Sequence, residues 1–171
     1  DQLYDWKKQG HRWVGLTAYD APTARVLESA SVPVILVGDS LGNVILGHDS
    51  TVPVTMDDMV HHSAAVRRGA ENTFVVCDMP FLAAQISDEE AIRNAGRLIQ
   101  EGMADAVKIE GGGARVGTIR RIVDAGIPTM GHLGLTPQNA TQLGGYKVQG
   151  NTPASATQIL KDAHALEECG A

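Results

Sequence analysis

Titratable side chains follow several apolar runs of the sequence, each at the point where the run stops. Asp39 follows "PVILVG", Asp78 ends "TFVVCD" and Glu110 ends "DAVKIE". Asp20 closes "WVGLTAYD" in the same way, and His132 takes this place in "PTMGHLGLTP". Converging carboxylates repel one another unless a proton or a cation compensates their charge. Oxygen donors with few sulfur or imidazole candidates beside them suit a hard cation such as Mg²⁺.

A simpler interpretation is that these acids cap the helices that follow the strands. Capping explains any one acid more readily than three together, because parallel α/β proteins build their chemistry at the carboxyl ends of the strands. The sequence therefore predicts that Asp39, Asp78 and Glu110 hold a metal ion, with capping as the alternative.

Three further polar residues accompany the acids. Lys108 lies two positions before Glu110, so the two side chains share one face of a strand. Lys108 can compensate the negative charge, bind a substrate carboxylate or oxyanion, or do both. Ser40 either donates a hydrogen bond to a ligand or caps a turn. His132, in the sequence "GHLG", is either structural or a ligand contact.

Helical patterns separate the apolar runs. "SDEEAIRNAGRLIQEG" opens with Ser87 and Glu90 at the spacing of a capping box and ends at Gly102. Other helices are predicted over residues 21–31, 57–69, 114–125 and 154–168. Alternating strands and helices are typical of a parallel sheet. Because the strands lack polar alternation, we expect both of their faces to be buried, as in a barrel or a doubly wound sheet.

The number of units favours a barrel. An eight-stranded (β/α)8 TIM barrel usually takes roughly 250 residues, whereas this α/β chain offers five strands and five helices in 171 residues. We therefore predict one incomplete TIM-barrel domain over residues 1–171, covering about the first five β/α units. The stretch 40–55 is expected to be a functional loop or to contain a small hairpin.

The composition excludes several classes of protein. A net charge of −6 argues against a nucleic-acid partner, which normally requires a basic face. No run approaches the roughly 18 apolar residues of a membrane span, and the start "DQLYDWKKQG" has no signal-peptide core. Cys77 and Cys169 have neither disulfide nor zinc spacing, which indicates reduced thiols. We expect a soluble cytoplasmic protein.

Two glycine-rich stretches remain. "EGGGAR" (110–115) lacks the GxGxxG and Walker patterns, so we interpret it as a tight turn between a strand and a helix. "GGYKVQG" (144–150) places Tyr146 and Lys147 either over the site or at a contact with another subunit.

Taken together, the sequence resembles the ketopantoate hydroxymethyltransferase family, in the phosphoenolpyruvate/pyruvate barrel superfamily. The resemblance rests on "LTAYD", "LVGDSLGNVILGHDSTVPVT", "VRRGA", "DMPF", "VKIEGG", "GHLGLTPQ" and "GGYKVQG", which occur in the family's order over essentially the whole chain. It implies transfer of a one-carbon unit from 5,10-methylenetetrahydrofolate to 3-methyl-2-oxobutanoate, giving 2-dehydropantoate through a magnesium-stabilised enolate. This reaction belongs to pantothenate and coenzyme A biosynthesis.

The resemblance also implies roles for particular residues. Asp39 and Asp78 would bind Mg²⁺, with Glu110 in or next to its coordination shell. The substrate contacts that it implies are Asp39, Ser40, Asp78, Lys108 and His132. No catalytic residue is assigned, because the family's proton-accepting glutamate follows a sixth strand, beyond Ala171. We therefore expect the protein to extend past Ala171, and the family implies a homo-oligomer, a decamer.

Two other functions stay open. One is a magnesium-dependent lyase of the same superfamily that acts on another 2-oxo acid. The stretches "GHLGLTPQ" and "GGYKVQG" favour the transferase over this lyase, and a folate-dependence assay would separate them. The other is a noncatalytic binding or assembly module, which the absence of Mg²⁺ and 2-oxo acid binding would favour.

Overall fold

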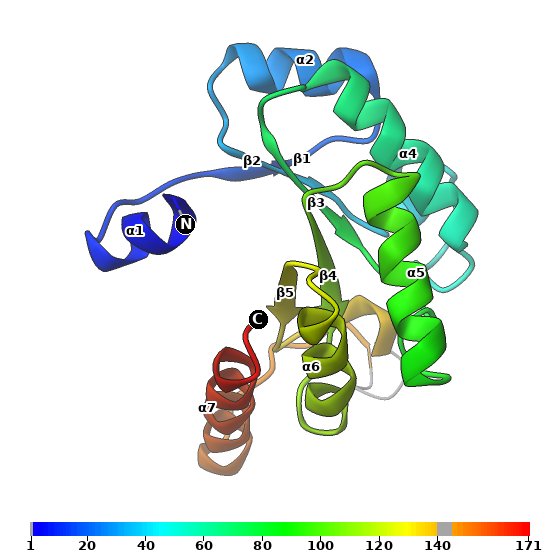
Figure 1. Cartoon of the computed structure of the whole chain (residues 1–171). Helices are drawn as coiled ribbons and strands as arrows, with labels where there is room; N and C mark the ends of the chain where they lie inside the picture. Colours follow the sequence, from blue (N-terminus) through cyan, green and yellow to red (C-terminus); the bar gives the residue numbers. More distant parts are fainter. Residues whose placement is uncertain (1, 140–144) are drawn as a thin grey trace.

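The strands of the chain lie side by side in one parallel sheet, in the order in which they occur in the sequence (Figure 1). The structure, a computed structural model, describes residues 2–139 and 145–171. Its elements are α1 (Gln2–Lys8), β1 (Gly15–Thr17), α2 (Ala21–Ser29), β2 (Val34–Val37), α3 (Leu41–Val44), α4 (Met56–Gly69), β3 (Phe74–Asp78), α5 (Asp88–Gln100), β4 (Ala106–Glu110), η1 (Gly113–Arg115), α6 (Val116–Asp124), β5 (Thr129–His132), η2 (Pro137–Asn139) and α7 (Pro153–Glu168). The alternation of strands and helices confirms the predicted α/β class.

The main hydrophobic core lies between the sheet and its helices. Helices α2, α4, α5, α6 and α7 follow one another around the outer face of the sheet, each in contact with the next (Figure 1). Burying this apolar surface is the main favourable contribution to folding. The core includes Ile35, Val37, Val75, Cys77, Val107 and Ile109 from the strands and Met59, Val66, Leu98, Ile119 and Ile122 from the helices.

A second, smaller cluster lies on the opposite face of the strands. Val34, Val76 and Ala106 are buried there, with Leu36 and Phe74 packed against them. The strand register explains this cluster, because Val34 is paired with Phe74, Leu36 with Val76, and Val76 with Ala106. Since side chains alternate along a strand, the next inward positions towards the carboxyl ends continue the same column.

Helix starts follow their capping residues. Thr55 and Asp58 form a complete capping box at α4. At α5 the predicted box is only half present: the Ser87 hydroxyl accepts a bond from the Glu90 N–H at 3.2 Å, but no return bond joins these two described residues. Asp20 caps α2 by accepting a bond from the N–H of Thr23 at 2.8 Å. For Asp20, therefore, the capping interpretation is correct.

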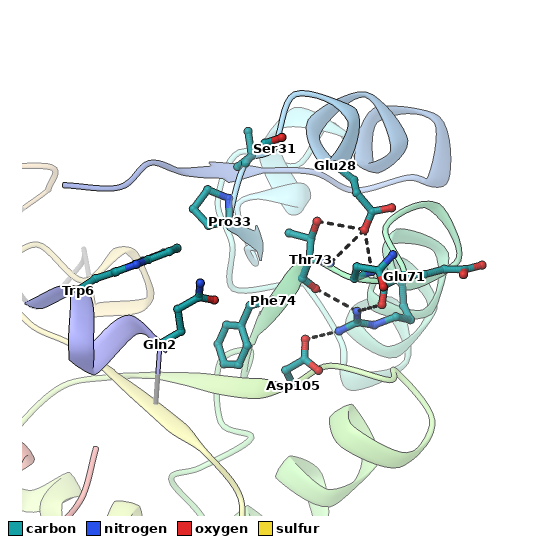
Figure 2. Close-up of a pocket in the computed structure, with 12 residues that line it drawn as sticks. Gln2, Trp6, Glu28, Ser31, Pro33, Glu71, Thr73, Phe74 and Asp105 are labelled. Atoms are coloured by element: carbon teal, nitrogen blue, oxygen red, sulfur yellow. Dashed lines mark hydrogen bonds and ion pairs between the residues drawn. The ribbon is translucent and has the colours of Figure 1, made fainter. Parts of the chain in front are cut away.

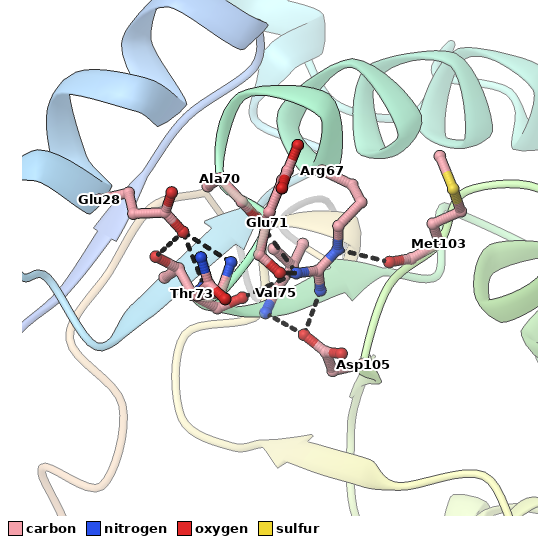
Figure 3. A network of polar contacts seen from close by, with 9 residues as sticks. Glu28, Arg67, Ala70, Glu71, Thr73, Val75, Met103 and Asp105 are labelled. Atoms are coloured by element: carbon pink, nitrogen blue, oxygen red, sulfur yellow. Dashed lines mark hydrogen bonds and ion pairs between the residues drawn. The ribbon is translucent and has the colours of Figure 1, made fainter.

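The amino end of the sheet is held by a polar network around Arg67 on α4 (Figure 3). Its guanidinium is paired with Asp105 and donates to the carbonyl oxygens of Ala70, Glu71, Thr73 and Met103. One oxygen of Glu28 accepts bonds from the N–H groups of Asn72 and Thr73 and from the Thr73 hydroxyl. The network ties α2, α4 and the segments before β3 and β4 together.

Helix α1 lies near this amino end (Figure 1). Leu3 on α1 packs against the smaller cluster. A cavity of about 500 Å³ separates α1 from the polar network, and its lining includes Trp6, Pro33 and Phe74 (Figure 2). The sequence analysis did not predict α1, because a helix without a fully buried residue carries little apolar periodicity.

Two other expectations need correction. All three residues of β1 are exposed, so burial on both faces does not hold for this strand, which is paired only with β2 in the described residues. Residues 40–55 contain the short helix α3 rather than a hairpin.

No helix in the described part of the chain combines the length and apolar character needed to cross a membrane.

Candidate functional site

The inward column of the sheet changes from apolar to charged towards the carboxyl ends of the strands. Asp78 is paired in register with Lys108, and Glu110 with His132. These side chains continue the column above Val76 and Ala106, so they share one face of the sheet. The two carboxylates are buried, with 3% of Asp78 and 4% of Glu110 exposed. The structure therefore brings these predicted site residues together.

Asp39 reaches the same place from a turn rather than from a strand. It follows β2 after Gly38, and its backbone N–H donates a hydrogen bond to Asp78 Oδ2 at 3.1 Å. A side chain at position 38 would lie 2.9 Å from Ser40 Oγ and 3.5 Å from Asp78 Oδ2, so glycine leaves the space that this close approach needs. Asp39 is 2% exposed and caps no helix.

Lys108 compensates part of the negative charge. Its Nζ lies 2.6 Å from Asp78 Oδ1, and both side chains are largely buried. Asp78 Oδ1 has no hydrogen bond of good geometry among the described residues, so the contact is an ion pair rather than a well-aligned hydrogen bond. Burial raises the pKa of Asp78, and the ammonium of Lys108 opposes that rise.

Asp39 forms no ion pair among the described residues, unlike Asp78. Burial raises the pKa of Asp39 to about 6, and the neighbouring charge of Asp78 adds to the rise. The hydrogen bond from Gln138 works in the opposite direction. A cation bound beside this acid would offset its negative charge and so stabilise the ionised form.

Glu110 contacts His132 and Gln138. Its Oε1 lies 3.2 Å from His132 Nδ1, and its Oε2 accepts a bond from the backbone N–H of Gln138 at 3.0 Å. The first contact holds the His132 ring against the end of β4. The His132 side chain remains 31% exposed, so a ligand can reach it.

Gln138, in η2 after β5, has no assigned role in the sequence analysis. Its side-chain amide donates to Asp39 Oδ2 at 2.8 Å and to the carbonyl oxygen of Met79 at 2.9 Å. The stretch "GHLGLTPQ" contained the signal, but spacing alone could not show that the chain turns back after β5 and crosses the ends of the preceding strands. Gln138 is 6% exposed.

Ser40 does not cap a turn with its side chain. Its hydroxyl forms a 2.8 Å hydrogen bond with the hydroxyl of Tyr19, a second residue that the sequence analysis missed. Tyr146 and Lys147 are exposed, and no contact in the described residues connects them with the buried acids. Gly144, the first residue of their glycine-rich stretch, lies outside the described residues.

The donor set suits a cation that uses few protein ligands. Asp39 and Asp78 supply adjacent buried oxygens, and the ammonium of Lys108 lies 2.6 Å from Asp78 Oδ1. No group of three or more acidic, histidine or cysteine side chains in residues 2–139 and 145–171 could hold a metal ion by itself. Mg²⁺ typically takes one or two carboxylates and keeps several waters, so it fits this pair.

Space for small molecules lies beside Glu110. A cavity of about 480 Å³ is lined by Glu110, the glycine-rich turn that follows it, and residues of two loops. Its other lining residues include Phe81, Gln85, Arg115 and Asn139. The glycine-rich turn leads from β4 into η1 and α6, as the sequence predicts.

The sequence is similar to a known family over its whole length. Residues 1–171 match the family described as ketopantoate hydroxymethyltransferase. The 3-methyl-2-oxobutanoate hydroxymethyltransferase of Heliobacterium modesticaldum is 58% identical over 170 residues, which cover 99% of this chain and 62% of that protein. The protein of the same name from Moorella thermoacetica is 57% identical over 169 residues, covering 99% and 63%. The chain thus spans about 62% of the length of such relatives.

Solved structures with the same fold show much lower sequence identity. Phosphonopyruvate hydrolase in complex with oxalate and Mg²⁺ superposes with a TM-score of 0.74 at 13% identity, covering 99% of this chain and 59% of that one. For 2,3-dimethylmalate lyase, a member of the PEP mutase/isocitrate lyase superfamily, the TM-score is 0.67 at 18% identity, covering 99% and 60%. These similarities confirm the predicted barrel fold, of which the chain forms a part with five parallel strands.

Proposed function

The chain belongs to the ketopantoate hydroxymethyltransferase family, and we propose that this protein transfers a hydroxymethyl group from 5,10-methylenetetrahydrofolate to 3-methyl-2-oxobutanoate, giving 2-dehydropantoate for pantothenate biosynthesis. The observation that carries the proposal is the convergence of Asp39 and Asp78 with Lys108 at the carboxyl ends of the strands. Barrel enzymes carry their active sites at this end. The match to the family favours this reaction over a lyase and over a noncatalytic module.

In this proposal Asp39 and Asp78 hold Mg²⁺, and Glu110 lies next to its coordination shell. When bound, Mg²⁺ supplies positive charge that polarises the keto and carboxylate oxygens of a 2-oxo acid. Phosphonopyruvate hydrolase, which has the same fold, was solved with Mg²⁺ and the dicarboxylate oxalate. That complex supports Mg²⁺ and an oxo acid as the molecules bound in this proposal. We assign no proton acceptor within residues 1–171, because these acids serve the cation and its surroundings.

The remaining site residues orient the substrate. Lys108 is close enough to Asp78 to place its ammonium beside a substrate carboxylate or a developing oxyanion. Ser40, held by Tyr19, presents a hydroxyl next to Asp39. His132 offers its partly exposed side chain, while Glu110 contacts its ring.

The surroundings of the site support the remaining partners. The cavity of about 480 Å³ beside Glu110 offers room for a folate co-substrate near the oxo acid. We propose a homo-oligomer, which the exposed apolar side chains of Val44, Ile45 and Leu46 support. A cytoplasmic location agrees with Cys77 and Cys169, which are both buried free thiols.

Magnesium binding tests the core of this proposal. Asp39→Asn and Asp78→Asn keep the size of the side chain and remove its charge, so each should lower the Mg²⁺ affinity about 100-fold in calorimetry, because Mg²⁺ relies on few protein carboxylates. Asp124→Asn, on the exposed end of α6, is the control and should bind Mg²⁺ like the parent. Unchanged affinity in both site variants would rule out this metal site.

Lys108→Met tests substrate binding separately. Methionine keeps much of the packing of the lysine stem but lacks the charge, so binding of 3-methyl-2-oxobutanoate in the presence of Mg²⁺ should weaken about tenfold. Lys161→Met, on the exposed face of α7, controls for loss of a positive charge. Parent-like oxo acid affinity in Lys108→Met would reduce Lys108 to a structural counter-ion of Asp78.

A further inference from the structure

Gln138 joins the ends of three strands through one residue. Its amide uses both of its hydrogens, one on Asp39 Oδ2 after β2 and one on the carbonyl oxygen of Met79 after β3. Its backbone N–H donates to Glu110 Oε2 at the end of β4. All three bonds lie in the interior, where an amide without partners would cost free energy.

The loop around Gln138 is built to hold this position. After β5 the chain turns at Gly134, whose φ of +91° favours glycine. Pro137 then opens η2, and the N–H of Asn139 donates to the carbonyl oxygen of the buried Thr136 at 2.9 Å. The backbone of Gln138 is therefore fixed to β4 before its side chain reaches towards β2 and β3.

The chemical type of Gln138 matters for a cation site. A lysine or arginine at this position would add a second positive charge beside that of Lys108 and compete with a cation. A neutral amide donates a hydrogen bond and leaves the full negative charge in place. Because the bond occupies Oδ2, it also decides which oxygen of Asp39 remains for a ligand: no hydrogen bond to Oδ1 is present among the described residues.

We propose that Gln138 is a positioning residue of the magnesium site: its amide fixes the rotation of the Asp39 carboxylate and directs Oδ1 of that carboxylate towards the cation. The inference rests on the proposed function, since it presupposes the cation at Asp39 and Asp78. Partners that orient metal ligands in this way typically change metal affinity by 10- to 100-fold when they are replaced.

Calorimetry on two matched variants provides the first test. Gln138→Met keeps the approximate volume and removes both donors, so its Mg²⁺ affinity should fall about tenfold. Gln158→Met makes the same change at an exposed position on α7 and should leave the affinity unchanged. An affinity of Gln138→Met within twofold of the parent would overturn the inference while leaving the magnesium site intact. A parent chain that binds no Mg²⁺ would overturn both proposals.

The parent protein supplies a second test that does not require the variant to fold. The side-chain amide resonances of Gln138 in ¹⁵N-labelled protein should shift on addition of Mg²⁺, because their acceptor is a metal ligand. The same resonances should not respond in Asp39→Asn at equal Mg²⁺ concentration. A glutamine that only ties the loop to Met79 would show no metal-dependent shift in the parent, and that result would overturn the proposal.

Discussion

Both ends of the sheet carry acids, but the surroundings shift the pKa values of these acids in opposite directions at the two ends. At the amino end, Glu28 accepts three hydrogen bonds through one oxygen, and the N–H groups of Asn72 and Thr73 lower its pKa. At the carboxyl end, burial raises the pKa values of Asp39 and Asp78. The acids of the first end support the fold, whereas those of the second are held against their own repulsion and are ready for a cation.

Replacing Arg67 should have the largest effect on stability, and it should act at the amino end of the sheet alone. Arg67→Met removes the ion pair with Asp105 and leaves several carbonyl oxygens without their donor, so the free energy of unfolding should fall by about 3 kcal/mol. Urea denaturation would measure this loss, with the exposed neighbour Arg68→Met as the control. Magnesium affinity of the folded protein should not change. A loss of stability below that of Arg68→Met would mean that the amino end does not hold the fold together.

The pH dependence of stability should show the raised pKa of Asp39 at the carboxyl end of the sheet. The pKa of Asp39 is raised from 3.8 to about 6 in the folded protein, so the associated stability is fully present below pH 3.8 and is lost as the pH rises through 6. In metal-free protein this amounts to about 3 kcal/mol. Asp39→Asn should flatten this part of the profile and be the more stable protein at pH 7.5. An identical pH profile for parent and variant would show that Asp39 is compensated already.

Replacing Glu28 should have the smallest effect on stability at pH 7, and its sign should be opposite to that of Asp39→Asn. Its lowered pKa means that it stabilises the fold above its ordinary pKa of 4.5 and that this contribution is lost as the pH falls through the lowered value. Glu28→Gln should therefore be slightly less stable than the parent at pH 7 and equal to it in acid. The exposed Glu71→Gln serves as the control in thermal unfolding scans. Equal stabilities of parent and Glu28→Gln at pH 7 would remove Glu28 from the comparison.

Sequence patterns predicted what depends on local order. The strands, the cap at Asp20 and the shared face of Lys108 and Glu110 all follow from periodicity and neighbouring residues. The contacts of Gln138 and Tyr19 could not be predicted in this way, because their partners lie 99 and 21 positions away. Which acid pairs with Lys108 was also open until the register placed Asp78 beside it. The approach of loops to distant strand ends is set by the tertiary fold rather than by neighbouring residues.

The in-order sheet has a consequence for synthesis of the chain. Each strand pairs with the one made just before it, so a nascent chain meets its partner strand already in place and the sheet can grow by one β/α unit at a time. The amide that holds Asp39 is made 99 positions later, roughly 10 s after it at ordinary elongation rates. During that interval Asp39 has no amide partner. The strands that carry Asp39 and Asp78 can thus pair before the centre at their ends is complete.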